Sequence, residues 1–116
     1  MVETEIKNAV IVSATMSTED HGMLSSFLHL DYGGSGQGFG GYALFSPEFK
    51  TDATGLWIWR CMEIAGVSEW TCLPGRTIRV RANHSSVEAI GHILKDLWFD
   101  PKKELAALNE PSPGVL

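Results

Sequence analysis

Six of the nine residues between Tyr32 and Tyr42 are glycine, and this run carries the clearest candidate for a ligand-binding motif. Gly36, Gly38 and Gly41 match the spacing GxGxxG, which in dinucleotide-binding proteins follows a strand and opens a helix that holds a pyrophosphate. Here the residues that follow, 42–46, are typical of a strand. The run therefore predicts a hairpin loop, and no cofactor is expected.

The predicted loop offers a partner several kinds of contact. Glycine lets another backbone approach closely, and one amide and two rings lie among the glycines. In the opposite arrangement, the phenylalanine of the run folds back onto the sheet and joins the core. The first interpretation gives the candidate partner-binding residues Gly36, Gln37, Gly38, Phe39 and Tyr42.

Two arginines complete the candidate partner-binding set. Arg79 and Arg81 alternate along a predicted strand and so share one face, where they can hold a phosphate or an acidic patch. Glu88 on the next predicted strand can instead neutralise them in a cross-strand ion pair. Both interpretations remain open from the sequence.

The sequence contains few residue patterns that indicate a metal site or a catalytic site. Four histidines, at positions 21, 29, 84 and 92, lie on separate segments, and no HxH, HExxH or CxxC pair fixes two ligands on one element. A metal or catalytic site built from His21, His29 and Asp31 is a weaker hypothesis than either of the two binding functions described below. A nucleophile motif such as GxSxG is absent. We therefore expect a protein that is not an enzyme and holds no metal.

The elements that would position these residues follow from hydrophobic periodicity. We expect a main helix over 52–65, a helical turn over 68–73 and a short helix over 101–108. The segment 87–94 also fits a helix, but Gly91 favours a strand. The expected fold is α+β, an antiparallel sheet of about five strands packed against one main helix, in a single domain (1–108) with a disordered tail (109–116). The predicted strands are 5–16, 23–32, 42–46, 76–82 and 87–94.

Composition narrows the class of protein. A chain of 116 residues suits one domain, and its formal net charge of −5 disfavours a general nucleic-acid binder, because such proteins need a basic footprint. Cys61 and Cys72 lack a metal-type spacing, and we expect both to be unpaired and buried. No signal peptide or membrane-spanning run is apparent, so we expect a cytoplasmic protein without a membrane partner.

Three strings in the chain resemble a family of small phage and prophage proteins of about this length: EDHG (19–22), LHLDYGGSGQGFGGYAL (28–44) and AIGHILKDLWFDP (89–101). The resemblance implies a mobile-element setting, with no cofactor and no catalytic residues to carry over. By analogy, small acidic phage proteins are often antagonists of host defence, including anti-CRISPR proteins.

The expected function is therefore non-enzymatic binding to a host protein or a defence nuclease complex such as CRISPR-Cas, as an inhibitor in the host cytoplasm. The alternative is an accessory module of phage DNA metabolism. Such a module would contact single-stranded nucleic acid through the aromatic and arginine side chains of the segment 70–80.

Overall fold

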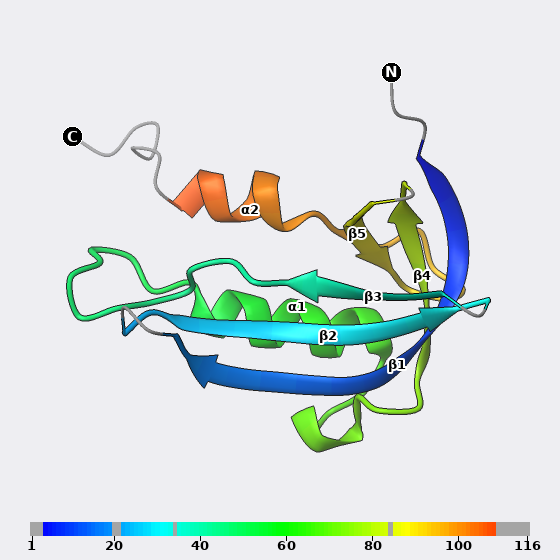
Figure 1. The fold of residues 1–116 in the computed structure, drawn as a ribbon, viewed down its shortest axis with the longest axis horizontal. Coiled ribbons are helices and arrows are strands. Elements are labelled where there is room, and N and C mark those ends of the chain that lie inside the picture. Colours follow the sequence, from blue (N-terminus) through cyan, green and yellow to red (C-terminus); the bar gives the residue numbers. More distant parts are fainter. Residues whose placement is uncertain (1–3, 20–21, 34, 84, 109–116) are drawn as a thin grey trace.

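One antiparallel sheet of six strands, in the order β3-β2-β1-β4-β5-β6, forms the frame of the protein in a computed structural model that describes residues 4–19, 22–33, 35–83 and 85–108 (Figure 1). The predicted α+β class is confirmed, and the described residues include two α-helices and one 3-10 turn. The predicted tail, 109–116, lies outside the described residues. The elements are β1 Glu5–Thr18, β2 Leu24–Tyr32, β3 Ser35–Gly40, α1 Thr54–Ala65, the 3-10 turn Trp70–Cys72, β4 Thr77–Ala82, β5 Val87–Gly91, β6 Trp98–Phe99 and α2 Pro101–Leu108.

The long strand β1 joins the two halves of the sheet. Its first half pairs with β4 and its second half with β2, and the register with β2 shifts between Ile11 and Ser13. Such a bulge inserts one extra residue and so exchanges the two faces of the strand. Ala9 and Ile11 are buried before the bulge, whereas Ala14 and Met16 pack against the core after it. Simple alternation along the predicted strand 5–16, which would put Ser13 on the same face as Ala9 and Ile11, therefore fails at the bulge.

Helix α1 crosses the concave side of the sheet, and β1 and β2 pass in front of it in Figure 1. Its inward stripe carries Trp57, whose ring stacks on Phe39 with centroids 5.4 Å apart and meets Phe99 edge-on at 5.6 Å. All three rings are fully buried. The helix ends at Ala65, as predicted, and is capped by Gly66, whose N–H donates to the Glu63 carbonyl. This aromatic cluster therefore joins α1 to both ends of the sheet.

The glycine run is a strand and not the predicted loop. Residues Ser35–Gly40 pair with β2, and because Tyr32 pairs with Ser35, only 33–34 connect the two strands. The side chain of Phe39 lies in the core, so the arrangement in which it folds back onto the sheet is right. The predicted strand over 42–46 contributes a single bridge, between Phe45 and Leu24. Burial of one large ring thus outweighs the low strand propensity of glycine.

Strand β5 ends earlier than predicted, at Gly91, and the chain then turns back over 92–97 into β6. The turn places Trp98 opposite Gly91, and a Cβ atom on Gly91 would lie 2.7 Å from the indole ring. The guanidinium of Arg79 lies over the same ring, 4.9 Å from its centroid. The predicted strand over 87–94 is thus right for its first five residues, and glycine is required where the indole packs.

The two cysteines differ in burial. Cys61 is buried on α1, and this burial raises the pKa of its thiol. Cys72 is exposed, so the prediction that both are buried is wrong for this residue. It lies on the 3-10 turn, which buries none of its own residues.

Replacing Gly91 with alanine is expected to destabilise the fold by about 1–3 kcal/mol, because the new methyl group would collide with the Trp98 ring. Urea denaturation followed by circular dichroism measures this free energy of unfolding. Gly55→Ala on α1 is the matched control: a Cβ there meets nothing within 4 Å, and helix propensity predicts a gain of up to about 1 kcal/mol. Equal effects from the two substitutions would contradict the packing explanation.

Candidate binding surface

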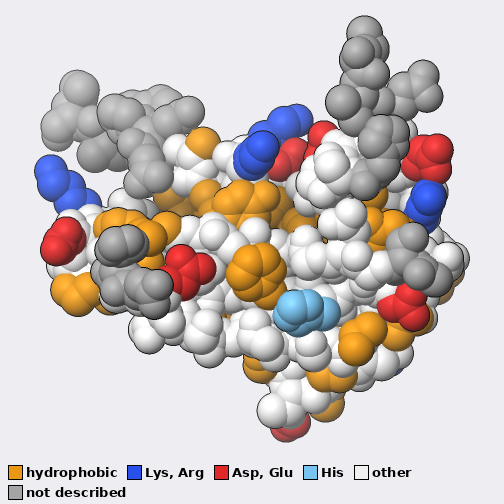
Figure 2. Space-filling view, in the orientation of Figure 1, with side chains coloured by type: hydrophobic (Ala, Val, Ile, Leu, Met, Phe, Trp, Pro, Cys, Tyr) orange, Lys and Arg blue, Asp and Glu red, His pale blue; other side chains and the backbone are white. Residues whose placement is uncertain are grey.

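Strand β3 has two unlike faces. Phe39 points into the core, and the alternation of a strand places Gly36 and Gly38 on the opposite side, paired with Asp31 and His29 of β2. We call this side of β1, β2 and β3, which is turned away from α1, the outer face; Figure 2 views it directly. Its residues are Val10, Val12, Thr15, Phe27, His29, Asp31, Gly36 and Gly38.

A hollow of about 350 Å³ lies on the outer face over β3, and we call it the glycine hollow. It forms because two residues of β3 present backbone alone to this side. The ring of Phe27 stacks on His29 with centroids 6.2 Å apart and covers β3 so closely that a Cβ on Gly38 would lie 3.2 Å from it. The hollow is lined by Val12, His29, Leu30, Asp31, Gly36, Gln37 and Gly38.

Exposed apolar side chains surround the glycine hollow. Val12 is 58% exposed, Val10 40% and Phe27 37%. Figure 2 shows few charged side chains across the middle of this face, whereas basic and acidic side chains gather along its upper rim. Apolar side chains that cluster on a weakly charged surface are typical of protein interaction sites.

A second depression, of about 520 Å³, lies between β3, β5 and the start of α2, and we call it the β3–β5 groove. The two strands come into contact but are not neighbours in the sheet order. Polar and charged side chains predominate in it. Its lining residues are Gly38, Gly40, Tyr42, Asn83, Ser86, Val87, Glu88, Asp100, Lys102 and Lys103.

Electrostatics in the groove centre on Arg81. Its guanidinium Nη2 donates to Asp100 at 2.9 Å, and its Nε lies 3.5 Å from Glu88. Tyr42 is half-buried beside them; burial, and then the Asp100 carboxylate, raise the pKa of its hydroxyl. The phenol therefore remains protonated, and able to donate a hydrogen bond, across the physiological range.

The structure brings together only part of the predicted site. Gly36, Gln37 and Gly38 line the glycine hollow, and Tyr42 lines the groove. Phe39, which belongs to the core, is excluded from any contact surface. An alternation of glycine with other residues from position 34 to 40 has the period of a strand, and this signal was available in the sequence.

The two predicted arginines serve the fold. Arg79 donates through Nε to the His92 carbonyl and through Nη2 to the Lys95 carbonyl, both at 2.7 Å, and so holds the 92–97 turn. Arg81 makes the ion pair with Glu88 that the sequence left open as its alternative. Both guanidinium groups are thus engaged within the protein. Sequence reasoning missed Val12, Phe27, Lys102 and Lys103, and it considered His29 only as a member of a metal or catalytic site.

Within the described ranges, no group of three or more histidine, cysteine, aspartate or glutamate side chains is arranged to hold a metal ion. His21 and His84 lie outside those ranges. In the same part of the chain, none of the helices has the length and apolar character needed to cross a membrane.

Comparisons with protein-family models, with curated proteins and with solved structures found no match to this chain.

Phe39→Ala is expected to lower the free energy of unfolding by about 3–5 kcal/mol, because it removes a fully buried ring from the contact with Trp57. Phe49→Ala is the control, since Phe49 is 39% exposed. Chemical denaturation of both variants measures the difference. If the Phe39 variant were as stable as the Phe49 variant, the result would contradict the buried strand and favour the exposed loop that the sequence predicted.

Removing the Asp100 charge should lower the pKa of Tyr42. Ultraviolet titration of tyrosinate measures the pKa of Tyr42 in Asp100→Asn, with Tyr32→Phe added so that only one tyrosine titrates. Glu88→Gln is the control, because Glu88 is a nearby carboxylate that does not contribute to the raised pKa of Tyr42. In the unfolded chain the tyrosine ionises at its ordinary pKa of 10.0, before the folded one does. Stability from this group is therefore present below pH 10 and is lost as the pH rises above it. An unchanged Tyr42 pKa in Asp100→Asn would show that the Asp100 charge does not act on the Tyr42 hydroxyl.

Proposed function

We propose that this protein acts without catalysis, by binding a partner protein through the outer face and its glycine hollow. The observation that carries the proposal is the position of Val10, Val12 and Phe27, which remain exposed on one sheet face around a floor of glycine backbone. Burying apolar surface against a partner is favourable by about 25 cal/mol for each Å². A protruding side chain of the partner fits the hollow, where the glycines offer no side chains of their own.

The openness of the hollow favours a macromolecule over a small ligand. Small-molecule sites are concave and bury most of their ligand's surface. The glycine hollow instead lies on the solvent side of a sheet, with β3 as its floor and Val12 and His29 at its sides. A rim of apolar side chains beyond the hollow adds contact area that only a large partner covers.

The first class of partner to test is a host-defence nuclease complex such as CRISPR-Cas, in the cytoplasm of the host cell. The resemblance to small phage proteins points to this class. A net charge of −5 also suits a partner with a basic nucleic-acid channel, where an acidic protein competes with the nucleic acid. In this setting the protein acts as a stoichiometric inhibitor.

Val12→Asp is expected to weaken binding to such a complex more than about tenfold, because it buries a charge in an apolar contact. Biolayer interferometry against purified CRISPR-Cas effector complexes measures the affinity, and circular dichroism checks that the variant is folded. Leu94→Asp is the matched control: Leu94 is 86% exposed and lies in the 92–97 turn, away from the outer face.

Two results would count against the outer face. In one, the two aspartate variants lose affinity equally, so that charge rather than position matters. In the other, hydrogen exchange of the bound protein protects the turn at 92–97 and leaves β1 and β2 unprotected. Failure of every complex to bind the unaltered protein would remove the defence nuclease as partner.

A further inference from the structure

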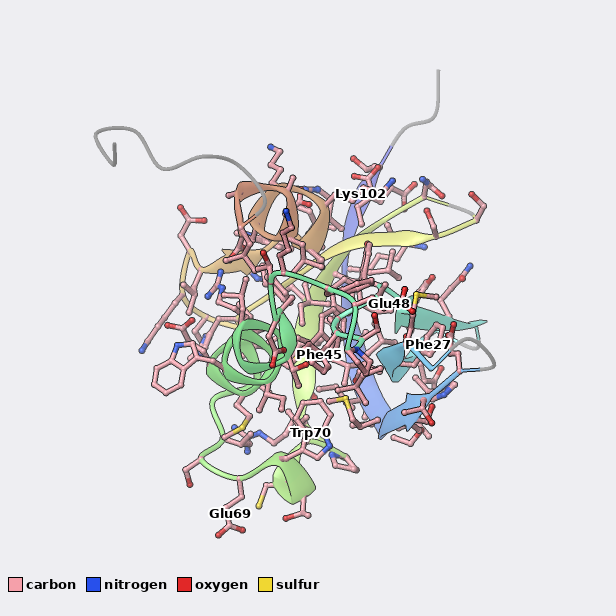
Figure 3. The ribbon with its side chains drawn as sticks, turned by 90° about the vertical axis from the view of Figure 1, so that its left-hand side faces the viewer. Phe27, Phe45, Glu48, Glu69, Trp70 and Lys102 are labelled. Atoms are coloured by element: carbon pink, nitrogen blue, oxygen red, sulfur yellow. The ribbon has the colours of Figure 1, made fainter. Side chains whose placement is uncertain are left out.

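Two lysines at the start of α2 lack the partners that the neighbouring charges have. Lys102 and Lys103 line the β3–β5 groove, and among the described residues neither ammonium lies within ion-pair distance of a carboxylate. Both carboxylates of the groove, Glu88 and Asp100, are already bound by Arg81. The groove lining thus holds two lysines and two carboxylates, and Arg81, which does not line the groove, adds a third cation beside these carboxylates, in a protein whose net charge is −5. Figure 3 shows Lys102 on α2, above Phe27 on β2.

The groove and the glycine hollow meet at one residue. Gly38 lines both depressions, and the Phe27 ring packs against its outward side, so the two depressions lie on either side of this position. The N–H of Gly41 donates to the Ser26 carbonyl at 2.8 Å. Because bonded and non-bonded pairs alternate in an antiparallel ladder, the backbone amides of Gly36 and Gly38 point away from β2. Because β3 is the edge strand of the sheet, an extended segment that lies along this edge can pair with these backbone groups.

We propose that the β3–β5 groove binds an extended, carboxylate-bearing segment of the same partner protein, whose acidic side chains pair with Lys102 and Lys103. This inference rests on the proposed function and adds the chemistry of the partner. The segment lies along the edge of β3 and enters the groove, where the protonated Tyr42 hydroxyl supplies a further donor.

Acidic protein suits this groove better than nucleic acid does. A nucleic-acid strand carries one negative charge at every phosphate, so it would place charges against Glu88 and Asp100 as well as against the lysines. A peptide can space its carboxylates so that they meet only the lysines. Aromatic rings suited to base stacking are also few in the groove, with Tyr42 alone among its lining residues in the described chain.

Fluorescence anisotropy with two labelled, end-capped decapeptides tests the groove. One alternates Val with Glu and the other alternates Val with Gln. The unaltered protein should bind the Glu peptide about fivefold more tightly at low salt, and sodium chloride should reduce this preference. Equal affinity for the two peptides would overturn the inference.

Variants then locate the preference. Lys102→Gln with Lys103→Gln should abolish it, whereas Lys50→Gln with Lys95→Gln, which removes the same charge elsewhere, should leave it intact. If the control pair abolishes the preference equally, net charge and not the groove explains it. A labelled ten-nucleotide thymidine strand that binds more tightly than the Glu peptide, and depends on Lys102 and Lys103, would assign the groove to nucleic acid and overturn the inference.

One variant separates this inference from the proposed function. Val12→Asp should keep the preference for the Glu peptide, because Val12 does not line the groove. If complexes bind in a Val12-dependent manner but the peptide preference is absent, the groove inference alone fails. If the preference is present and depends on Lys102 and Lys103 while Val12→Asp leaves complex binding unchanged, the outer face fails as the principal contact.

Discussion

The stack of Phe39 on Trp57 is the contact on which the rest of the structure depends. Phe39 is the one large apolar side chain in β3, and without its burial a strand of glycines would have little reason to join the sheet. Once Phe39 points inward, the alternation of the strand turns Gly36 and Gly38 outward. The core contact and the exposed surface are therefore two sides of one constraint.

Ion pairs and hydrogen bonds fix the second depression in the same way. Arg81 joins β4 to the start of α2 through Asp100, and Arg60 on α1 donates to Glu104 of α2 at 2.9 Å and to the Trp98 carbonyl. These bonds fix where α2 begins, and with it the lysines at its first turn. The charged groups of the groove thus divide into those that hold the fold and those left to face solvent.

Local patterns predicted the elements whose burial follows a simple period. Leu28 and Leu30 alternate inward along β2, and Trp57, Cys61 and Ile64 form the buried stripe of α1, so both elements lie where their periodicity predicted a strand and a helix. Prediction failed where a distant contact decided the outcome. Strand β3 was not predicted because glycine has a low strand propensity and because the ring that packs on Phe39 belongs to a helix distant in the sequence. The bulge beside Ile11 has no local sequence signal. Of the candidate site, the glycines were found, but the apolar residues around them lie on other strands.

The glycine hollow exists because two residues lack side chains, and this affects which substitutions can test it. An alanine scan usually removes side-chain atoms from a contact surface, but at Gly36 and Gly38 alanine adds a methyl group. At Gly38 the added carbon would press on Phe27, at 3.2 Å, and at Gly36 it would meet only the Leu30 carbonyl oxygen, at an ordinary 3.6 Å. Tolerance to substitution should therefore differ between two neighbouring glycines that look interchangeable in the sequence.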